Sequence, residues 1–265
     1  YGAKPGQVNY PYQAAAGGPK GEVFVADQFN HRISVFTAEG DFVRSFAGKG
    51  SGAGEFEYPM GLHVHGEMLL VADGAGRRIN VFSLVGDFLF EFGGPRSERG
   101  ALQDPLGVVV ERASSEVFVV DYGFDCIQVY DLKGEYKRRW GSPGRGAGQF
   151  DNPAGIAVHG GRVYVTDRNR VQSFGAATGE LLSELRSRKL AGATGIAVTD
   201  AGLFVSGSVK GVGFVRSFAH DGTYRGEYAP ASYRKLGLAS AINGTHLLVT
   251  DETAHQVYVL AVRAG

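Results

Sequence analysis

Five aspartates at matching positions are the first residues in this chain whose type and spacing could support chemistry. They end the similar apolar runs VFVAD, LLVAD, VFVVD, VYVTD and LLVTD, at Asp27, Asp73, Asp121, Asp167 and Asp251, and a sixth run, LFVSG, ends at Gly207. A ring of carboxylates could bind a divalent cation or transfer protons. A residue that recurs in every copy rarely marks one active site, so we expect each aspartate to accept hydrogen bonds from loop N–H groups and to pair with a following arginine, such as Arg32 or Arg78.

Histidine offers a second possible chemistry, a metal centre. The chain has seven histidines, of which His63 and His65 lie together in the segment GLHVHG. Zinc requires three or four converging ligands. The residues expected to face the same way as His63 in the other copies are small or aliphatic: Ala15, Val109, Ala157, Ala197 and Ala241. We therefore predict no metal, no cofactor and no catalytic residue on the central axis.

The single cysteine, Cys126, excludes an internal disulfide and adjoins Asp125 in an apolar segment. No histidine is placed nearby to activate it, so we expect a small buried packing residue rather than a nucleophile. The sequon Asn243-Gly244-Thr245 would matter only in a secreted protein. These residues leave the compartment open, although we slightly favour the cytoplasm.

The elements that must position these residues form a repeat. The ends of the six apolar runs are separated by 46, 48, 46, 40 and 44 residues, which is the spacing of four-stranded propeller blades. Each copy divides into four strands joined by turn residues, as in GLHVHG, MLLVAD, RRINVFS and GDFLFEFGG of the second copy. The sequence therefore predicts an all-β fold, a six-bladed β-propeller of four-stranded antiparallel blades, with residues 1–265 as a single domain.

Composition agrees with this fold and narrows the possible partners. Hydrophobic residues make up 43% and charged residues 20%, as in an ordinary globular protein, and the 41 glycines suit many tight turns. No run of 18 apolar residues occurs, so we predict no membrane insertion. Lys plus Arg and Asp plus Glu both number 27, so net charge does not draw the whole molecule to nucleic acid or membranes.

The repeat resembles a known family. Its pattern is D-x-x-N-x-R-I-x-V-F, then G-x-F, then a glycine-rich loop that ends in F-x-x-P-x-G, as in ADQFNHRISVF of the first copy. This pattern resembles the NHL repeat and is specific in the first four copies, whereas the fifth departs, with Gly207 and the insertion SVKGVG. The resemblance implies a six-bladed propeller that binds partners, and some NHL domains of the tripartite-motif family bind RNA on one face.

Two groups of enzymes have related propellers, but the residues that a resemblance would carry over are missing here. Peptidyl-hydroxyglycine amidating lyases place a histidine after the blade-opening proline, where this chain has Met60, Leu106 and Ala154. Gluconolactonase-like hydrolases hold a divalent cation with acids and Asn on the inner strands, which here read LHV, VVV, IAV, IAV and SAI. We therefore predict no enzyme and identify no small-molecule substrate, with a metal-dependent lyase or hydrolase as the third alternative.

The ends of the chain suggest how the ring closes. The opening Tyr-Gly matches the Phe-Gly and Trp-Gly pairs that end fourth strands elsewhere, and the last copy ends after its third strand, in VYVLAVRAG. We expect a propeller excised from a longer chain, in which Tyr1 lies beside the strand from Val257 to Val262. Upstream residues would then supply the outer strand of the last blade.

Charge sorts by face in the predicted propeller. The loops between second and third strands share one face with the loops that precede first strands, and together they hold sixteen Lys or Arg and seven Asp or Glu besides the strand-end aspartates. The loops of the opposite face hold four Lys or Arg and twelve Asp or Glu. Aromatic residues interleave with the basic loops, at Tyr12, Phe29, Tyr58, Tyr122, Phe124 and Tyr233.

This basic, aromatic face predicts a non-catalytic binding platform, a scaffold that recognises a protein or peptide partner. The alternative partner is single-stranded RNA, because aromatic rings beside arginine stack on bases. A further alternative is that Phe29 and Phe124 only pack over the blades. The predicted partner-binding residues are Phe29, Arg32, Arg77, Arg78, Tyr122, Phe124, Arg168, Arg170, Lys210 and Arg234.

Overall fold

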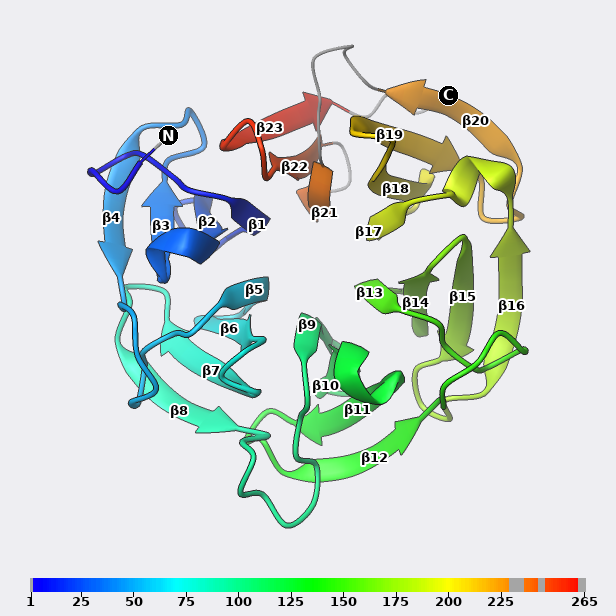
Figure 1. Ribbon diagram of the computed structural model, residues 1–265, viewed down its shortest axis with the longest axis horizontal. Coiled ribbons are helices and arrows are strands. Elements are labelled where there is room, and N and C mark those ends of the chain that lie inside the picture. Colours follow the sequence, from blue (N-terminus) through cyan, green and yellow to red (C-terminus); the bar gives the residue numbers. More distant parts are fainter. Residues whose placement is uncertain (1, 229–235, 243–245, 262–265) are drawn as a thin grey trace.

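Short antiparallel strands arranged in a ring make up this molecule. The computed structural model describes residues 2–228, 236–242 and 246–261, and 23 β-strands and three 3₁₀-helices occur in these ranges. Consecutive strands pair in antiparallel register and radiate from a common centre (Figure 1). The predicted all-β propeller with four-stranded antiparallel blades is confirmed.

Each of the first five blades has four strands. The first blade consists of β1 (Pro11–Gly17), β2 (Glu22–Asp27), β3 (Arg32–Phe36) and β4 (Phe42–Phe46). The second consists of β5 (Pro59–His65), β6 (Met68–Asp73), β7 (Arg78–Ser83) and β8 (Phe88–Phe92). The third consists of β9 (Pro105–Glu111), β10 (Glu116–Asp121), β11 (Cys126–Asp131) and β12 (Tyr136–Trp140). The fourth consists of β13 (Pro153–His159), β14 (Arg162–Asp167), β15 (Arg170–Gly175) and β16 (Leu181–Arg186). The fifth consists of β17 (Ala193–Thr199), β18 (Gly202–Val209), β19 (Val212–Phe218) and β20 (Tyr224–Tyr228).

The last set of strands closes the ring beside the first blade. It consists of β21 (Leu236–Ile242), β22 (His246–Asp251) and β23 (Gln256–Ala261), and it joins the first blade through one parallel pair, Gln13 with Leu238. Within the described residues this set therefore has three strands, and β23 lies at its edge. Tyr1 and Val262 lie outside the described residues, so the predicted contact between the two ends of the chain stays a prediction.

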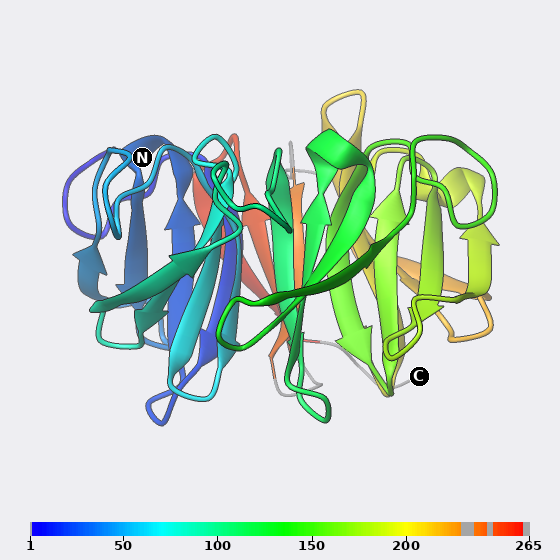
Figure 2. The same cartoon turned by 90° about the horizontal axis from the view of Figure 1, so that it is seen from below.

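Alternating strand directions place the loops on two faces. Figure 2 shows the loops between second and third strands at the top, with the helices η1 (Gln28–Asn30) and η2 (Tyr122–Phe124) among them. The third helix, η3 (Arg188–Leu190), precedes β17. Backbone hydrogen bonds join these loops to the loops that precede first strands, as between Gly74 N and Tyr58 O at 3.0 Å. We call the face formed by both kinds of loop the upper face. The prediction that these two kinds of loop share one face is confirmed.

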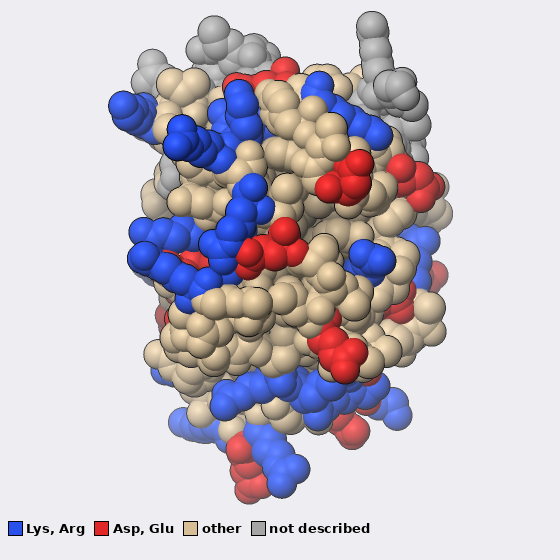
Figure 3. Space-filling model, turned by 90° about the vertical axis from the view of Figure 1, so that its right-hand side faces the viewer, with Lys and Arg blue, Asp and Glu red and all other residues tan. Residues whose placement is uncertain are grey.

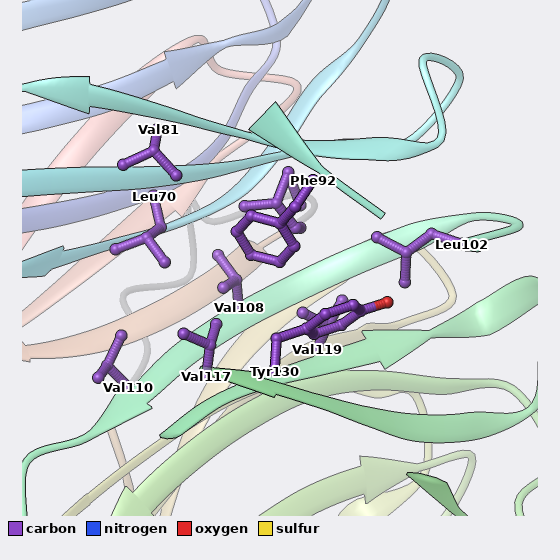
Figure 4. Packing of buried hydrophobic residues seen from close by; sticks show 11 residues of the cluster. Leu70, Val81, Phe92, Leu102, Val108, Val110, Val117, Val119 and Tyr130 are labelled. Atoms are coloured by element: carbon purple, nitrogen blue, oxygen red, sulfur yellow. The ribbon is translucent and has the colours of Figure 1, made fainter. Parts of the chain in front are cut away.

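The core lies between neighbouring blades. Strand residues alternate between the two sides of a sheet, so the apolar side chains of one blade pack against those of the next. Between the second and third blades, Phe92 and Tyr130 face each other with ring centroids 4.8 Å apart, among the valines and leucines that Figure 4 shows. The Tyr130 hydroxyl donates to Gly100 O at 2.6 Å and so ties this core to the loop before β9.

The strand-end aspartates are structural, as predicted. Asp27 is fully buried and accepts hydrogen bonds from Asn9 N at 2.7 Å, Arg32 Nε at 2.8 Å and Ser34 Oγ at 3.0 Å. This carboxylate thus holds the loop before the blade to the third strand. In the next three blades, Asp73, Asp121 and Asp167 likewise accept from N–H groups of the preceding loop, although Asp121 pairs with Gln128 rather than with an arginine.

The fifth blade replaces the carboxylate with two glycines. A Cβ atom at Gly207 would overlap Gly192 O, and a Cβ atom at Gly192 would overlap Ser208 O. The loop therefore touches the strand directly, and Ser208 N donates to Gly192 O at 3.1 Å. This close approach explains why the repeat departs from its pattern at Gly207.

We expect Asp27→Ala to lower the free energy of unfolding by about 3 kcal/mol, because the substitution leaves the guanidinium of Arg32 and the N–H of Asn9 without their buried acceptor. Urea denaturation would measure the change. Glu39→Ala, an exposed change on the opposite face, is the control. Equal stability of the two variants would contradict the structural role of the aspartate.

Candidate functional site

The loops of the upper face share an unusual backbone feature. Each loop between a second and a third strand contains a non-glycine residue in the left-handed region, with φ between 47° and 59°: His31, Arg77, Asp125, Arg168, Lys210 and His255. Glycine adopts this conformation without steric cost, whereas other residues are strained there by about 1 kcal/mol. Side chains have thus been placed where the backbone alone would favour glycine.

A hollow of about 600 Å³ opens on the upper face between the first three blades, and we call it the aromatic hollow. Its rim carries Phe29, Tyr58 and Tyr122, which are 49%, 43% and 39% exposed, and Met60 lies deeper inside it. Ligand sites in proteins commonly have this size and this mixture of apolar walls with a few polar groups. The structure thus brings together the predicted residues Phe29 and Tyr122.

Aromatic contacts fix the position of Phe29. One face of its ring stacks on Tyr10 with centroids 4.6 Å apart, and Tyr58 approaches it edge-on at 6.4 Å. The alternative that Phe29 packs over the blade is therefore correct for one face of the ring only. Phe124 is 39% exposed and lies in η2 beside the aromatic hollow rather than in its lining.

Two charged side chains supply polarity inside the aromatic hollow. Arg77 donates from Nη2 to Gln103 Oε1 at 3.1 Å, while its Nε–H is buried without a hydrogen-bond partner among the described residues. Asp104 is half-buried, and burial together with the charge of Asp121 raises the pKa of its carboxyl group. This Nε atom is out of reach of a ligand, but Arg77 is partly exposed and lines the hollow, so the outer part of its guanidinium is suited to bind an acceptor atom of a ligand.

Three of the predicted partner-binding arginines are structural instead. Arg78 and Arg170 are buried, and Arg32 is nearly so. Arg78 donates to the carbonyls of Ser51, Gly52 and Glu55, at 3.0, 2.9 and 2.9 Å, and therefore holds the loop before β5. These arginines open third strands, where the preceding loop covers them, so the prediction that they meet a partner is corrected for Arg78 and Arg170.

Arginines also gather over the fourth blade, at a cavity of about 230 Å³. Arg145 Nε and Arg168 Nη1 both donate to Asp151 Oδ2 at 2.7 Å, and Arg186 pairs with Glu184. We call Arg145, Arg168 and Arg186 the arginine cluster. Sequence analysis selected Arg168 alone, because the three residues come from separate loops and strands that only the fold brings together.

The remaining predicted residues are placed differently. Lys210 is exposed in the loop between β18 and β19, and Arg234 lies outside the described residues. Figure 3 shows Lys and Arg side chains on its left side, where the upper face lies, and also along its lower edge and on its right, with acidic side chains among them. Much of this basic charge is internally paired, as the contacts of Arg32, Arg78 and Arg168 show.

Among the described residues, the titratable side chains that line the central channel are His63 and Arg112. A cavity of about 220 Å³ is lined there by His63 and by the predicted neighbours Ala15, Val109, Ala157 and Ala197. The matching register position of the last strand set is Ser240, which pairs with Leu248 as His63 pairs with Leu70, rather than the predicted Ala241. Among the described residues, no group of three His, Cys, Asp or Glu side chains could hold a metal ion.

Burial also controls the two other candidate groups. It lowers the pKa of His63 to about 4, with smaller contributions from the charges of His65 and Arg112. It raises the pKa of Cys126 to about 12, so this thiol stays protonated, and its predicted role as a buried packing residue is confirmed. In the described ranges, no helix is both long and apolar enough to cross a membrane.

We expect His63 to make folding depend on pH. Its folded pKa lies below the unfolded value of about 6.5, so the unfolded chain binds more protons between pH 6.5 and 4, and stability falls as the pH decreases through this range. His63→Val, which copies Val109 of the next blade, should remove about 2 kcal/mol of that loss at pH 4. The free energy of unfolding of both proteins would be measured in urea as a function of pH. The same dependence on pH in the two proteins would contradict this assignment.

Comparison with known proteins supports the fold. Residues 19–95 match a family model described as a 6-bladed beta-propeller. A segment of 61 residues is 44% identical to the RING finger protein nhl-1 of Caenorhabditis elegans, which covers 23% of this chain and only 6% of that protein. The chain therefore spans a small part of the length of this relative. Together the two matches support an NHL-like propeller family.

Solved structures of enzymes have a similar fold. A catalytically inactive virginiamycin B lyase from Staphylococcus aureus with quinupristin superposes with a TM-score of 0.70 at 16% identity, over 97% of this chain and 83% of the lyase. A gluconolactonase from Xanthomonas campestris superposes with a TM-score of 0.72 at 15% identity, over 97% of this chain and 87% of the enzyme. At such identities the likeness concerns the fold alone.

Proposed function

We propose that this NHL-like chain is a six-bladed propeller that acts as a non-catalytic binding platform for a protein or peptide. The aromatic hollow carries the proposal. The side chains of three aromatic residues around one concave site, Phe29, Tyr58 and Tyr122, remain between 39% and 49% exposed. Large apolar side chains gathered on a surface usually mark an interaction site. Tyrosine and arginine are also enriched among the residues that dominate binding energy at interfaces.

The polar groups of the aromatic hollow favour a peptide. The guanidinium of the partly exposed Arg77 lines the hollow and could donate to a main-chain carbonyl or to a carboxylate. The half-buried carboxyl group of Asp104 lies in the lining of the same cavity and could accept from a main-chain N–H. A peptide carries both kinds of group on every residue, and its apolar side chains would cover the exposed rings.

Single-stranded RNA is the second candidate, because exposed rings beside arginine can stack on bases. RNA affinity, however, depends mainly on cations that neutralise backbone phosphates. Many arginines of the upper face are already paired, such as Arg32 with Asp27 at 2.8 Å and Arg168 with Asp151 at 2.7 Å. This internal pairing reduces the charge that a backbone could meet, and it ranks RNA below a peptide.

We expect Phe29→Ala and Tyr122→Ala each to weaken a selected peptide at least about tenfold, because each substitution removes an exposed ring from the rim. Peptides would be selected from a random phage-displayed library on the wild-type protein, and affinities would be measured by fluorescence anisotropy. Arg77→Glu should have a similar effect. Buried Arg78 and Arg170 are unsuitable for charge reversal, because their loss would disturb folding.

Glu39→Lys and Asp87→Lys on the opposite face are the controls and should leave peptide affinity nearly unchanged. A control variant that loses the peptide while Phe29→Ala retains it would assign the working surface to the other face. A salt titration separates the two partners, since RNA affinity falls steeply and linearly on logarithmic axes whereas an aromatic anchor retains most of its affinity.

The absence of catalysis is part of the proposal. It is supported by the inner strands, which present Ala15, Val109, Ala157 and Ala197 beside the single histidine His63. Such a set offers too few donors for the cation of a metal-dependent lyase or hydrolase. The enzymes of similar fold carry their chemistry on side chains, and fold alone does not transfer it.

We expect protein purified without added ions to contain well under one equivalent of zinc or calcium, because His63 would be the only inner-strand ligand of the described channel. Elemental analysis by mass spectrometry would measure the metal content, with His63→Val as the matched control. One equivalent of metal in the wild-type protein that is lost in the variant would contradict the non-catalytic assignment.

A further inference from the structure

The arginine cluster presents donors that the fold leaves available. The side chains of Arg145, Arg168 and Arg186 are 72%, 48% and 57% exposed. Arg145 uses only Nε and Arg168 only Nη1 in hydrogen bonds within the described structure. Each guanidinium has five N–H donors in a planar fork, so most donors of both side chains face the cavity or the solvent without a protein acceptor.

Arg168 lies in a short loop and adopts an unfavourable backbone conformation. The loop between β14 and β15 contains two residues, 168–169, where the first three blades have four. Arg168 adopts a φ of 54° there, a conformation in which glycine would be unstrained. The same short loop brings Arg168 to Asp151, which Arg145 reaches from the other side. A strained arginine that meets a second arginine over an open cavity is typical of a functional site.

The charges around the cavity leave room for an anion. Arg170 and Asp167 form a buried pair below it, with Arg170 Nη2 and Asp167 Oδ2 2.7 Å apart. Among the described residues, four arginines at the cavity, namely Arg170 and the three of the cluster, pair with three carboxylates, and Glu184 is shared between Arg170 and Arg186. Hydrogen bonds from Arg145 lower the pKa of Asp151, so this carboxylate is already ionised at neutral pH and the excess of one cation persists.

The cluster is connected to the aromatic hollow through the third blade. Asn152 N, next to Asp151, donates to Asp125 Oδ1 at 3.4 Å. Asp125 follows directly after η2, the helix that carries Tyr122 on the rim of the hollow. This contact places the loops of the third and fourth blades side by side between the two sites.

We propose that the arginine cluster binds the phosphate group of a phosphorylated side chain in the peptide partner. The inference rests on the proposed binding function and specifies its ligand. Arginine forks match the oxygen atoms of a phosphate monoester, which carries a charge of about −1.5 to −2 at neutral pH. The three guanidinium groups surround one compact cavity of about 230 Å³, an arrangement that suits a single dianion better than the evenly spaced monoanions of an RNA backbone.

Glycine substitution tests the site without endangering the fold. Arg168→Gly removes the guanidinium and relieves the left-handed backbone, so the melting temperature should stay equal or rise by up to about 3 °C. Ser115→Gly makes the same backbone change at φ 55° in the exposed turn between β9 and β10, on the opposite face, and is the matched control. Arg145→Ala is a second cluster variant, at a side chain that is 72% exposed.

The first measurement uses phenyl phosphate as the probe. Titration into ¹⁵N-labelled protein should shift the arginine Nε–H signals of the wild type, with an affinity at least about tenfold weaker in Arg168→Gly and Arg145→Ala. Ser115→Gly should bind as the wild type does. Equal affinity in all four proteins, or an equal loss in Ser115→Gly, would overturn the proposal.

The second measurement uses fluorescein-labelled nonapeptide libraries with a central phosphoserine or serine. The wild type should prefer the phosphorylated library at least about tenfold, and Arg168→Gly should lose most of that preference. If both libraries bind equally and Phe29→Ala weakens both, the binding platform stands and the phosphate site is wrong. If Phe29→Ala weakens neither library, the proposed function fails as well. If a ten-residue oligouridylate outcompetes the phosphopeptides and depends equally on Arg168, the site belongs to RNA and the proposal is overturned.

Discussion

The buried carboxylate at the end of each second strand is the interaction on which the upper face depends. In the second blade, Asp73 accepts hydrogen bonds from Tyr58 N at 2.8 Å and Gly76 N at 3.2 Å. The first donor belongs to the loop before the blade and the second to the loop between its second and third strands. Because one side chain fixes both loops, the positions of Tyr58 and Arg77 on the rim of the aromatic hollow follow from a residue that no ligand could touch.

This constraint separates the arginines of the upper face into two kinds. An arginine that opens a third strand, such as Arg78, lies beneath the tethered loop and donates to its carbonyls. An arginine one or two positions earlier, such as Arg77 or Arg168, occupies the left-handed turn above the tether. The first kind stabilises the loops, whereas the second kind carries backbone strain and exposes its guanidinium, which is the pattern expected where side-chain identity serves binding rather than stability.

The sequence predicts the architecture well because the same structural pattern recurs in several copies of the repeat. Apolar alternation, turn glycines and blade spacing all indicate the same fold, and the tethering role of Asp27 and the burial of Cys126 follow from their local context. The burial of Arg78 could not be predicted from charge, since it adjoins Arg77 and differs only in strand position. The arginine cluster could not be predicted either, because residues 145, 168 and 186 meet only after the four strands of the fourth blade have folded.

The fifth blade, which lacks the strand-end carboxylate, shows what this carboxylate contributes to the other blades. The loop before β17 has six residues, 187–192, whereas the loops before β5, β9 and β13 have twelve. A short loop reaches the second strand without a side chain between them, and the contact of Gly192 with Gly207 and Ser208 is a direct backbone contact. A twelve-residue loop needs a buried anchor to be ordered. Once it is held in place, such a loop forms the walls of a concave surface. The long loops and their anchors therefore place the aromatic hollow and the arginine cluster on the first four blades.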